Sequence, residues 1–197
     1  MFEDRQKRSY AKLKDGKVEV YIGKDKEGKK IVETRDRIVA RVTGIKEKEF
    51  EYQGEKMQAW VVELADADSQ AELSLGYSSN FTRGFFNSLL AADFTKPISI
   101  SCYVKEFEGK VYNTPSLWQN DVMLKWVKEE MPKTKKVKVG SKIVIDDADA
   151  VKWTVELVEE INKKIASQRG TEVSAPSDKP KSEADESFED FINDVAK

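Results

Sequence analysis

The sequence predicts a mainly β protein with two helices and an acidic C-terminal tail. Three observations support this class. Apolar and polar residues alternate along most of residues 17–123, which is typical of half-buried strands. Helical spacing replaces the alternation over residues 80–93 and again over residues 151–165. Beyond residue 170 the chain is rich in Ser, Pro, Lys and acids, a composition that does not favour a packed core.

The strands are expected in hairpins, after a first segment that is an arm or an early strand. Residues 17–33 predict a hairpin with its turn at 23–28, and residues 35–54 predict a long strand in which Gly44 marks a bulge or bend. Gly54 marks the turn into the next strand. Further strands are expected at 55–67, 71–79, 97–109 and 110–119, the last paired with 121–127 around Asn120-Asp121.

The two helices are expected to pack through apolar stripes. In the first, Phe81, Phe85, Leu89 and Ala92 recur at helical spacing, and Ser79 or Asn80 is placed to cap its start. The second follows a short strand. Its stripe is Val151, Val155, Val158, Ile161 and Ile165. The apolar rows of the strands, including Ile98, Ile100, Cys102 and Val104, are assigned to the core, as are Trp60, Trp126 and Trp153.

Three curved strands, a helix and two more strands follow the order of the OB-fold, a small Greek-key barrel. Other mixed β folds have a similar order of strands and helices. We therefore expect an OB-fold-like barrel with one helix between strands 3 and 4 and a C-terminal helix. The expected domain spans residues 1–170, including the N-terminal hairpin, and is followed by a disordered linker, 171–185, and an acidic tail segment, 186–197.

Charge is divided unevenly along the chain. Residues 171–197 hold eight acidic and three basic residues and carry −5, so residues 1–170 carry +3 of the overall −2. A mildly basic body on an acidic tail is a pattern that any proposed function has to explain. The lone Cys102 and the lack of a signal-like or membrane-spanning apolar run favour a soluble, cytoplasmic protein with no membrane partner.

Residue types argue against an enzyme. The chain has no histidine and one cysteine, which excludes His-dependent nucleophiles and the usual zinc sites, and it lacks a phosphate-binding glycine loop. We expect no catalytic residues, no cofactor and no metal. Asp146, Asp147 and Asp149 are the alternative, a Mg²⁺ site, but acids at a helix start are favoured by the helix dipole.

Aromatic and basic residues share the polar faces of several strands. Tyr103, Lys105 and Phe107 emerge together if Cys102 and Val104 enter the core. Such a surface is typical of single-stranded nucleic-acid binding, in which bases stack on rings and cations follow phosphates. Each ring taken alone has the alternative role of covering the barrel mouth. The other candidates are Tyr112, Trp118, Arg37, Arg41, Lys46, Lys48, Phe50 and Tyr52, and the lysine run 133–142 is either a phosphate contact or a solvated loop.

The tail ends in a segment with helical spacing. Phe188, Phe191, Ile192 and Val195 would form one apolar face, and Glu189, Asp190 and Asp194 the other. So short a segment is marginal as a free helix but can fold in a partner's groove. Its acids can instead lie in the protein's own basic groove, or it can be an ordinary solubilising terminus. We assign partner binding to Phe188, Phe191, Ile192, Asp190 and Asp194.

The strand order, FNSLL in the first helix, the strand with Tyr103, Lys105 and Phe107, and the acidic tail with phenylalanines resemble the single-stranded DNA-binding proteins of DNA phages. The resemblance spans most of residues 30–130 and the tail. It implies an OB barrel that binds the strand, a tail that recruits replication and recombination proteins and competes with DNA, and a place in the host cell cytoplasm. Unlike many such tails, this one ends in Val195-Ala196-Lys197 rather than in phenylalanine.

The leading hypothesis is therefore a non-catalytic, sequence-tolerant single-stranded DNA-binding protein that protects DNA in replication and recombination. The alternative is a protein-interaction or virion scaffold built on a β-barrel, and a metal-dependent nuclease has only scattered acids in its favour. The sequence leaves open whether the protein is a monomer or a homo-oligomer, and whether it prefers DNA to RNA.

Overall fold

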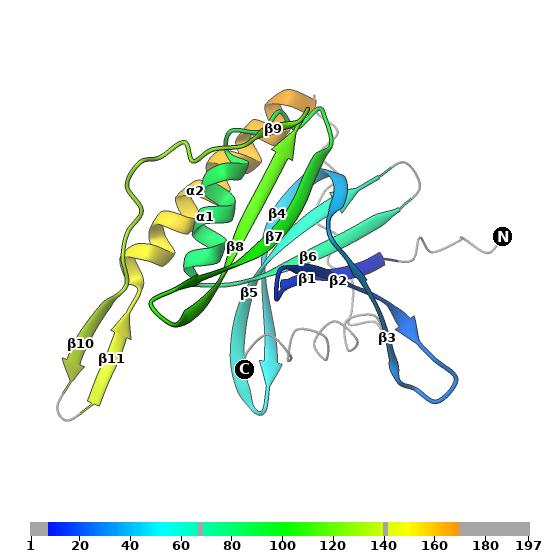
Figure 1. Ribbon diagram of the computed structural model, residues 1–197. Coiled ribbons are helices and arrows are strands. Elements are labelled where there is room, and N and C mark those ends of the chain that lie inside the picture. Colours follow the sequence, from blue (N-terminus) through cyan, green and yellow to red (C-terminus); the bar gives the residue numbers. More distant parts are fainter. Residues whose placement is uncertain (1–7, 67–68, 140–141, 170–197) are drawn as a thin grey trace.

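The computed structural model describes residues 8–66, 69–139 and 142–169, and in them the chain is mainly β with two helices (Figure 1). The mainly β expectation is confirmed. The strands are β1 (Arg8–Lys14), β2 (Lys17–Lys24), β3 (Lys30–Arg35), β4 (Ile38–Tyr52), β5 (Glu55–Ala65), β6 (Gln70–Gly76), β7 (Ile98–Phe107), β8 (Lys110–Gln119), β9 (Val122–Met123), β10 (Lys135–Val139) and β11 (Lys142–Asp146). The helices are α1 (Asn80–Leu89) and α2 (Ala148–Arg169).

Nine strands form one mixed sheet in the order β3-β2-β1-β6-β5-β4-β7-β8-β9, and β10 and β11 form a separate hairpin. All neighbours in the large sheet are antiparallel except β1 and β6, which run parallel. The sequence correctly places the first helix between the third and fourth strands that follow the N-terminal hairpin. In space, β7 returns after α1 to lie beside β4.

Strand β4 changes partners along its length, and its bend divides the sheet into two parts. Residues 38–40 pair with β7, whereas residues 41–52 pair with β5. The register with β5 shifts between Val42 and Gly44, which confirms the bulge expected at Gly44. The expected hairpin turn at Gln53-Gly54 also forms, with both residues at positive φ, a conformation that glycine adopts without strain.

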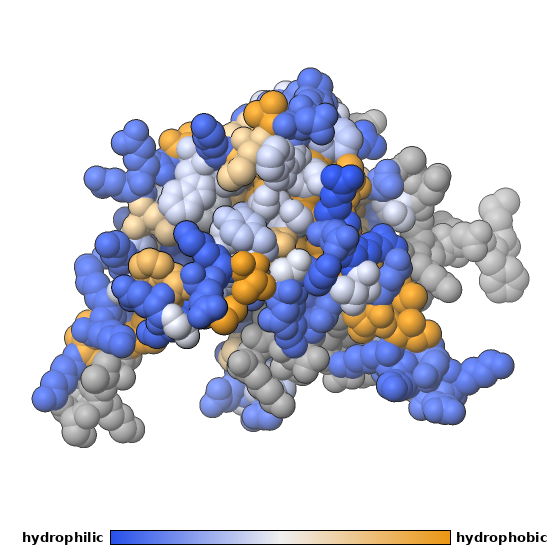
Figure 2. Space-filling model, viewed as in Figure 1, coloured by the Kyte–Doolittle hydropathy of each residue, from blue (hydrophilic) through white to orange (hydrophobic). Residues whose placement is uncertain are grey.

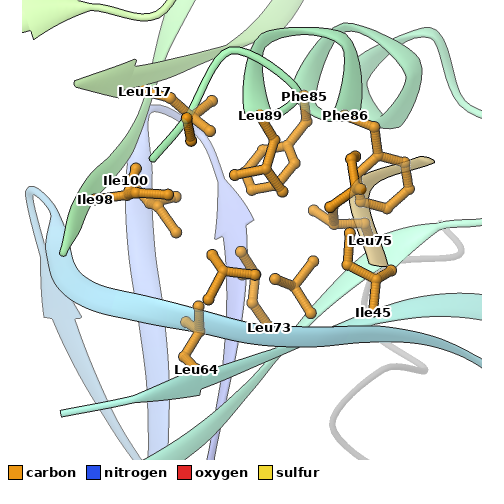
Figure 3. Packing of buried hydrophobic residues seen from close by; sticks show 14 of the residues in the cluster. Ile45, Leu64, Leu73, Leu75, Phe85, Phe86, Leu89, Ile98, Ile100 and Leu117 are labelled. Carbon is orange, nitrogen blue, oxygen red and sulfur yellow. The ribbon is translucent and has the colours of Figure 1, made fainter. Parts of the chain in front are cut away.

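The main core lies between the large sheet and the two helices (Figure 3). Phe85, Phe86 and Leu89 of α1 point toward buried strand residues such as Leu73 and Leu75. Ser79 caps α1, because its hydroxyl accepts a hydrogen bond of 3.1 Å from the backbone N–H of Thr82. Helix α2 packs through the second half of its expected stripe, Val158, Ile161 and Ile165, together with Leu157.

A second apolar cluster lies on the opposite face of the sheet. It consists of Tyr10, Tyr21, Phe50, Ala59 and Val61, with Tyr52 and Met57 at its margin, and we call it the outer cluster. Tyr10 alternates with Ala11, Tyr21 with Val20 and Val61 with Val62, and the second member of each pair belongs to the main core. The large sheet therefore has apolar side chains on both faces where β2, β1, β5 and the end of β4 lie.

Several expectations need correction. The lysine run begun at Lys133 is not a loop along its whole length, because β10 and β11 form a hairpin in it. Val104 is exposed although its row was assigned to the core, because β7 runs past the end of the core. Trp126 is also exposed, whereas Trp60 is buried as expected. The linker 171–185 and the tail 186–197 lie outside the described residues, and neither described helix is long and apolar enough to cross a membrane.

Candidate functional site

The β7–β8 hairpin presents aromatic and basic side chains on one face. Strand alternation puts Tyr103, Lys105 and Phe107 on the same side of β7. In the antiparallel register Lys105 lies opposite Tyr112 and Phe107 opposite Lys110, and directly opposed residues share a face. Two of the four rings, Tyr112 and Phe107, therefore have a lysine directly across the strand pair, whereas Tyr103 lies opposite Thr114. We call this surface the hairpin face, with the members Tyr103, Lys105, Phe107, Lys110, Tyr112 and Trp118.

The rings of the hairpin face are open to solvent. Tyr103 and Tyr112 are each 47% exposed, Phe107 is 58% exposed and Trp118 is 41% exposed. Trp118 lies opposite Ser99, and its indole N–H donates a 2.8 Å hydrogen bond to the Ser116 hydroxyl. This bond orients the ring and leaves part of it accessible. Four exposed rings on one face provide flat apolar surface on which a ligand can stack.

The start of β4 extends the hairpin face on the other side of β7. Val39 pairs with Ser99, which in turn pairs with Trp118, so these three residues form a row across the strands. Arg37 and Arg41 flank Val39 at the same two-residue spacing, and both are exposed. A shallow hollow at this place is lined by Arg37, Val39, Ser99, Ser101, Trp118 and Asp121, among others.

The basic side chains of this surface are not engaged in ion pairs with described acidic residues. Within the described ranges, no carboxylate makes an ion pair with Arg37, Arg41, Lys105 or Lys110. A cation without a protein partner loses none of its own ion pairs when a phosphate binds. The hairpin face therefore has both components of a single-strand surface, exposed rings and available positive charge.

The turn between β1 and β2 supports the hairpin from its other face. The backbone N–H of Gly16 donates to the Asn113 side-chain oxygen at 3.3 Å, and the Cys102 thiol donates to the Lys17 carbonyl at 3.5 Å. A Cβ on Gly16 would lie 3.3 Å from a methyl of Val104, so the approach is close. Burial raises the pKa of Cys102, which disfavours its thiolate and gives this cysteine a structural rather than a reactive environment.

The four candidates at the far end of β4 lie elsewhere. Lys46, Lys48, Phe50 and Tyr52 follow the bulge and pair with β5, so they do not join the hairpin face. Phe50 is only 7% exposed within the outer cluster, and Tyr52 packs at its margin. Lys46, on the same strand, forms ion pairs with Glu63 at 2.8 Å and with Glu72 at 2.9 Å. Burial lowers the pKa of Lys46, but the hydrogen bonds to Glu63 and Glu72 outweigh it and leave the pKa raised.

Val39 and Lys110 belong to the surface but were missed by sequence reasoning. Val39 was not among the predicted site residues, and its pairing with Ser99 and its exposure place it on this surface. Lys110 follows the turn, and only the cross-strand pairing with Phe107 reveals it. The Arg37-Val39-Arg41 spacing is the one signal that was available. The tail residues Phe188, Phe191, Ile192, Asp190 and Asp194 lie outside the described residues.

Two of the three acids considered for Mg²⁺ have other partners. Asp146 accepts from the backbone N–H of Ala148 at 3.3 Å, and Asp149 pairs with Lys135 at 3.1 Å. Residues 8–66, 69–139 and 142–169 contain no group of three or more Cys, Asp or Glu side chains placed to hold a metal ion. In comparisons with known proteins, no family model matches this chain, and neither a curated protein nor a solved structure is significantly similar to it.

Proposed function

We propose that this protein binds single-stranded DNA without strong sequence preference and without catalysis. The observation that carries the proposal is the hairpin face, where four exposed rings alternate with Lys105 and Lys110 and continue into Arg37 and Arg41. Every base has a π-face, so stacking on such rings tolerates any sequence. The bases of a duplex are already stacked on one another, so the same surface favours the unpaired strand.

We also propose that the fold is of the OB type, with β4, β5, β6, β7 and β8 as its five strands. The spatial order β6-β5-β4-β7 is that of a Greek key, since β7 returns through α1 to lie beside the first strand. The bend at Gly44 lets β4 serve both parts of the sheet. We propose that the combination of strands, helix and tail places the chain with the single-stranded DNA-binding proteins of DNA phages.

The tail has a role of its own in this proposal. Segment 186–197 recruits replication or recombination proteins through Phe188, Phe191 and Ile192, and its acids compete with DNA for the basic body. A flexible tether of the length of residues 171–185 would span about 20 Å on average, and such tethers hold a ligand near millimolar concentration. Deleting residues 171–197 is expected to tighten DNA binding at low salt and to matter less at high salt, where the attraction is screened. Equal affinities of the two chains at low salt would contradict the competition.

Titration with oligo(dT) tests the proposed function directly. We expect quenching of the intrinsic fluorescence that saturates at a defined site size, and much weaker binding to a duplex of equal length. Affinity is expected to fall with salt, because bound cations displace condensed counterions. Equal affinity for both forms would remove the stacking mechanism. No binding of either form would leave the scaffold protein as the better explanation.

A further inference from the structure

The hairpin β10–β11 stands apart from the large sheet, and its segment has a higher net positive charge than residues 1–170 taken together. It forms a two-stranded sheet of its own, and in Figure 1 it projects from the end of α2 away from the rest of the chain. Residues 133–146 hold five lysines and one acid, a net charge of +4, whereas residues 1–170 together carry only +3. The rest of that body is therefore close to neutral. We call residues 133–139 and 142–146 the wing.

Core packing fixes the base of the wing. Strand β11 ends at Asp146 and α2 begins at Ala148, so a single residue joins the wing to the helix. Lys135 of β10 pairs with Asp149 in the first turn of α2 at 3.1 Å, which ties the other strand to the same helix. Since Leu157 and Ile161 of α2 are buried in the main core, the helix holds the wing in a defined direction.

Several side chains of the wing are exposed and are not packed against the rest of the protein. Lys133, Lys136 and Lys138 are exposed, and no described residue makes an ion pair with them. Val137 and Ile145, on opposite faces of the hairpin, are 41% and 63% exposed. A two-stranded hairpin with solvent on both faces is marginally stable by itself. In Figure 2, hydrophilic side chains cover much of this projection at the lower left.

We propose that the wing is a second DNA contact, which grips the sugar-phosphate backbone of a strand whose bases stack on the hairpin face. This proposal rests on the proposed function. The wing offers no aromatic side chain to a base, and its lysines are point charges that suit phosphates. The two surfaces then divide the binding energy. The hairpin face supplies stacking, which depends little on salt, and the wing supplies much of the salt-dependent part.

Salt titrations of wing variants test the division. The triple variant Lys133→Gln, Lys136→Gln, Lys138→Gln removes three charges but keeps Lys135 and its bond to Asp149. The matched control is Lys24→Gln, Lys26→Gln, Lys29→Gln, which removes three exposed lysines from the turn region of another hairpin, β2–β3. Binding of oligo(dT) to the full-length chains is measured between 50 and 200 mM NaCl, with circular dichroism to check the fold.

We expect the wing variant to lose about 2 from the slope of log affinity against log salt, since each phosphate contact on a single strand contributes about 0.7. The ratio of parental to variant affinity should therefore fall about tenfold or more as NaCl is raised from 50 to 200 mM. The control should keep the slope of the parent. A wing variant with the parental slope, or a control with the same loss, overturns the wing contact while leaving the proposed function in place.

The alternative occupant of the wing, an acidic segment of another protein copy, gives a different result. In that case the wing variant would bind oligo(dT) with an unchanged or higher affinity and would show less self-association by sedimentation, and the DNA contact would be wrong. If the parent chain itself binds no oligonucleotide, the proposed function fails, and the wing proposal fails with it.

Discussion

The hairpin face and the outer cluster have similar side chains and opposite environments. Both combine aromatic rings with lysines on a sheet face that points away from the main core. On the hairpin face the rings are between 41% and 58% exposed, and Lys105 and Lys110 make no ion pair within the described chain. In the outer cluster Tyr10, Tyr21 and Phe50 are buried, and the adjacent Lys46 bonds to two glutamates.

The difference shows that an aromatic beside a lysine does not by itself make a ligand surface. What separates the two sets is whether the rings have one another to pack against and whether the cation already has a carboxylate. Tyr10 and Tyr21 lie directly opposite each other, with ring centroids 6.4 Å apart, and share their apolar area. The hairpin face therefore has free area and charge to offer DNA, and the outer cluster contributes to stability. Three comparisons of variants test this division.

The largest expected effect is on stability, from Phe50→Ala. Removing a buried phenylalanine leaves a cavity, and we expect a loss of about 3 kcal/mol in the free energy of unfolding. Phe107→Ala, on the exposed hairpin, should change it by less than about 0.5 kcal/mol. Urea unfolding followed by circular dichroism compares the two variants. Equal losses would mean that Phe107 is packed as firmly as Phe50.

The next effect is on DNA binding, from Tyr103→Ala or Phe107→Ala. Each is expected to weaken oligo(dT) binding by about 1–3 kcal/mol with an unchanged fold, because one stacked base loses its ring. Val111→Ala is the matched control, since Val111 is exposed on the opposite face of the same hairpin. Unchanged binding by both ring variants would assign Tyr103 and Phe107 to packing, whereas weakened binding by Val111→Ala would move the DNA to the other face.

How far the sequence predicted these regions depends on how local the signal is. Period-two alternation located β4, β5 and β7, and the turn residues at Gln53-Gly54 and Asn120-Asp121 located two hairpins. The face to which a ring belongs was also predictable for Tyr103 and Phe107. Burial was not, because Phe50 is covered within a cluster that includes Tyr10 and Tyr21, from strands remote in sequence. The parallel pairing of β1 with β6 joins β1 and β2 to the sheet that contains β4 and β5. The side chains of Tyr10 and Tyr21 thereby lie on the same face of the sheet as Phe50.

The smallest expected effect comes from Lys46→Gln, which removes the cation between Glu63 and Glu72. We expect a loss of about 0.5–1 kcal/mol in unfolding free energy at neutral pH, typical of partly exposed ion pairs, and no change in the salt slope of DNA binding. The pKa of Lys46 is raised above its ordinary 10.5, so its contribution is complete below that pH and disappears as pH rises through the folded-state pKa.

Unfolding in urea at pH values from 7 to 12 measures this contribution as the difference between the parent and Lys46→Gln. The two curves should converge at the alkaline end. A difference that persists there would mean that the substitution acts through packing and not through charge. A lower salt slope in DNA binding would place Lys46 in the DNA contact and would break the division between the two faces.

Photocrosslinking of bound oligo(dT), with the linked peptides identified by mass spectrometry, tests the division of the two aromatic sets most directly. Zero-length crosslinks form only where a base touches a side chain, so each adduct marks a contact. We predict adducts on Tyr103, Phe107, Tyr112 and Trp118, which are exposed on the hairpin face. Adducts confined to Tyr10, Tyr21, Phe50 or Tyr52 would place the DNA on the outer cluster and would contradict the account.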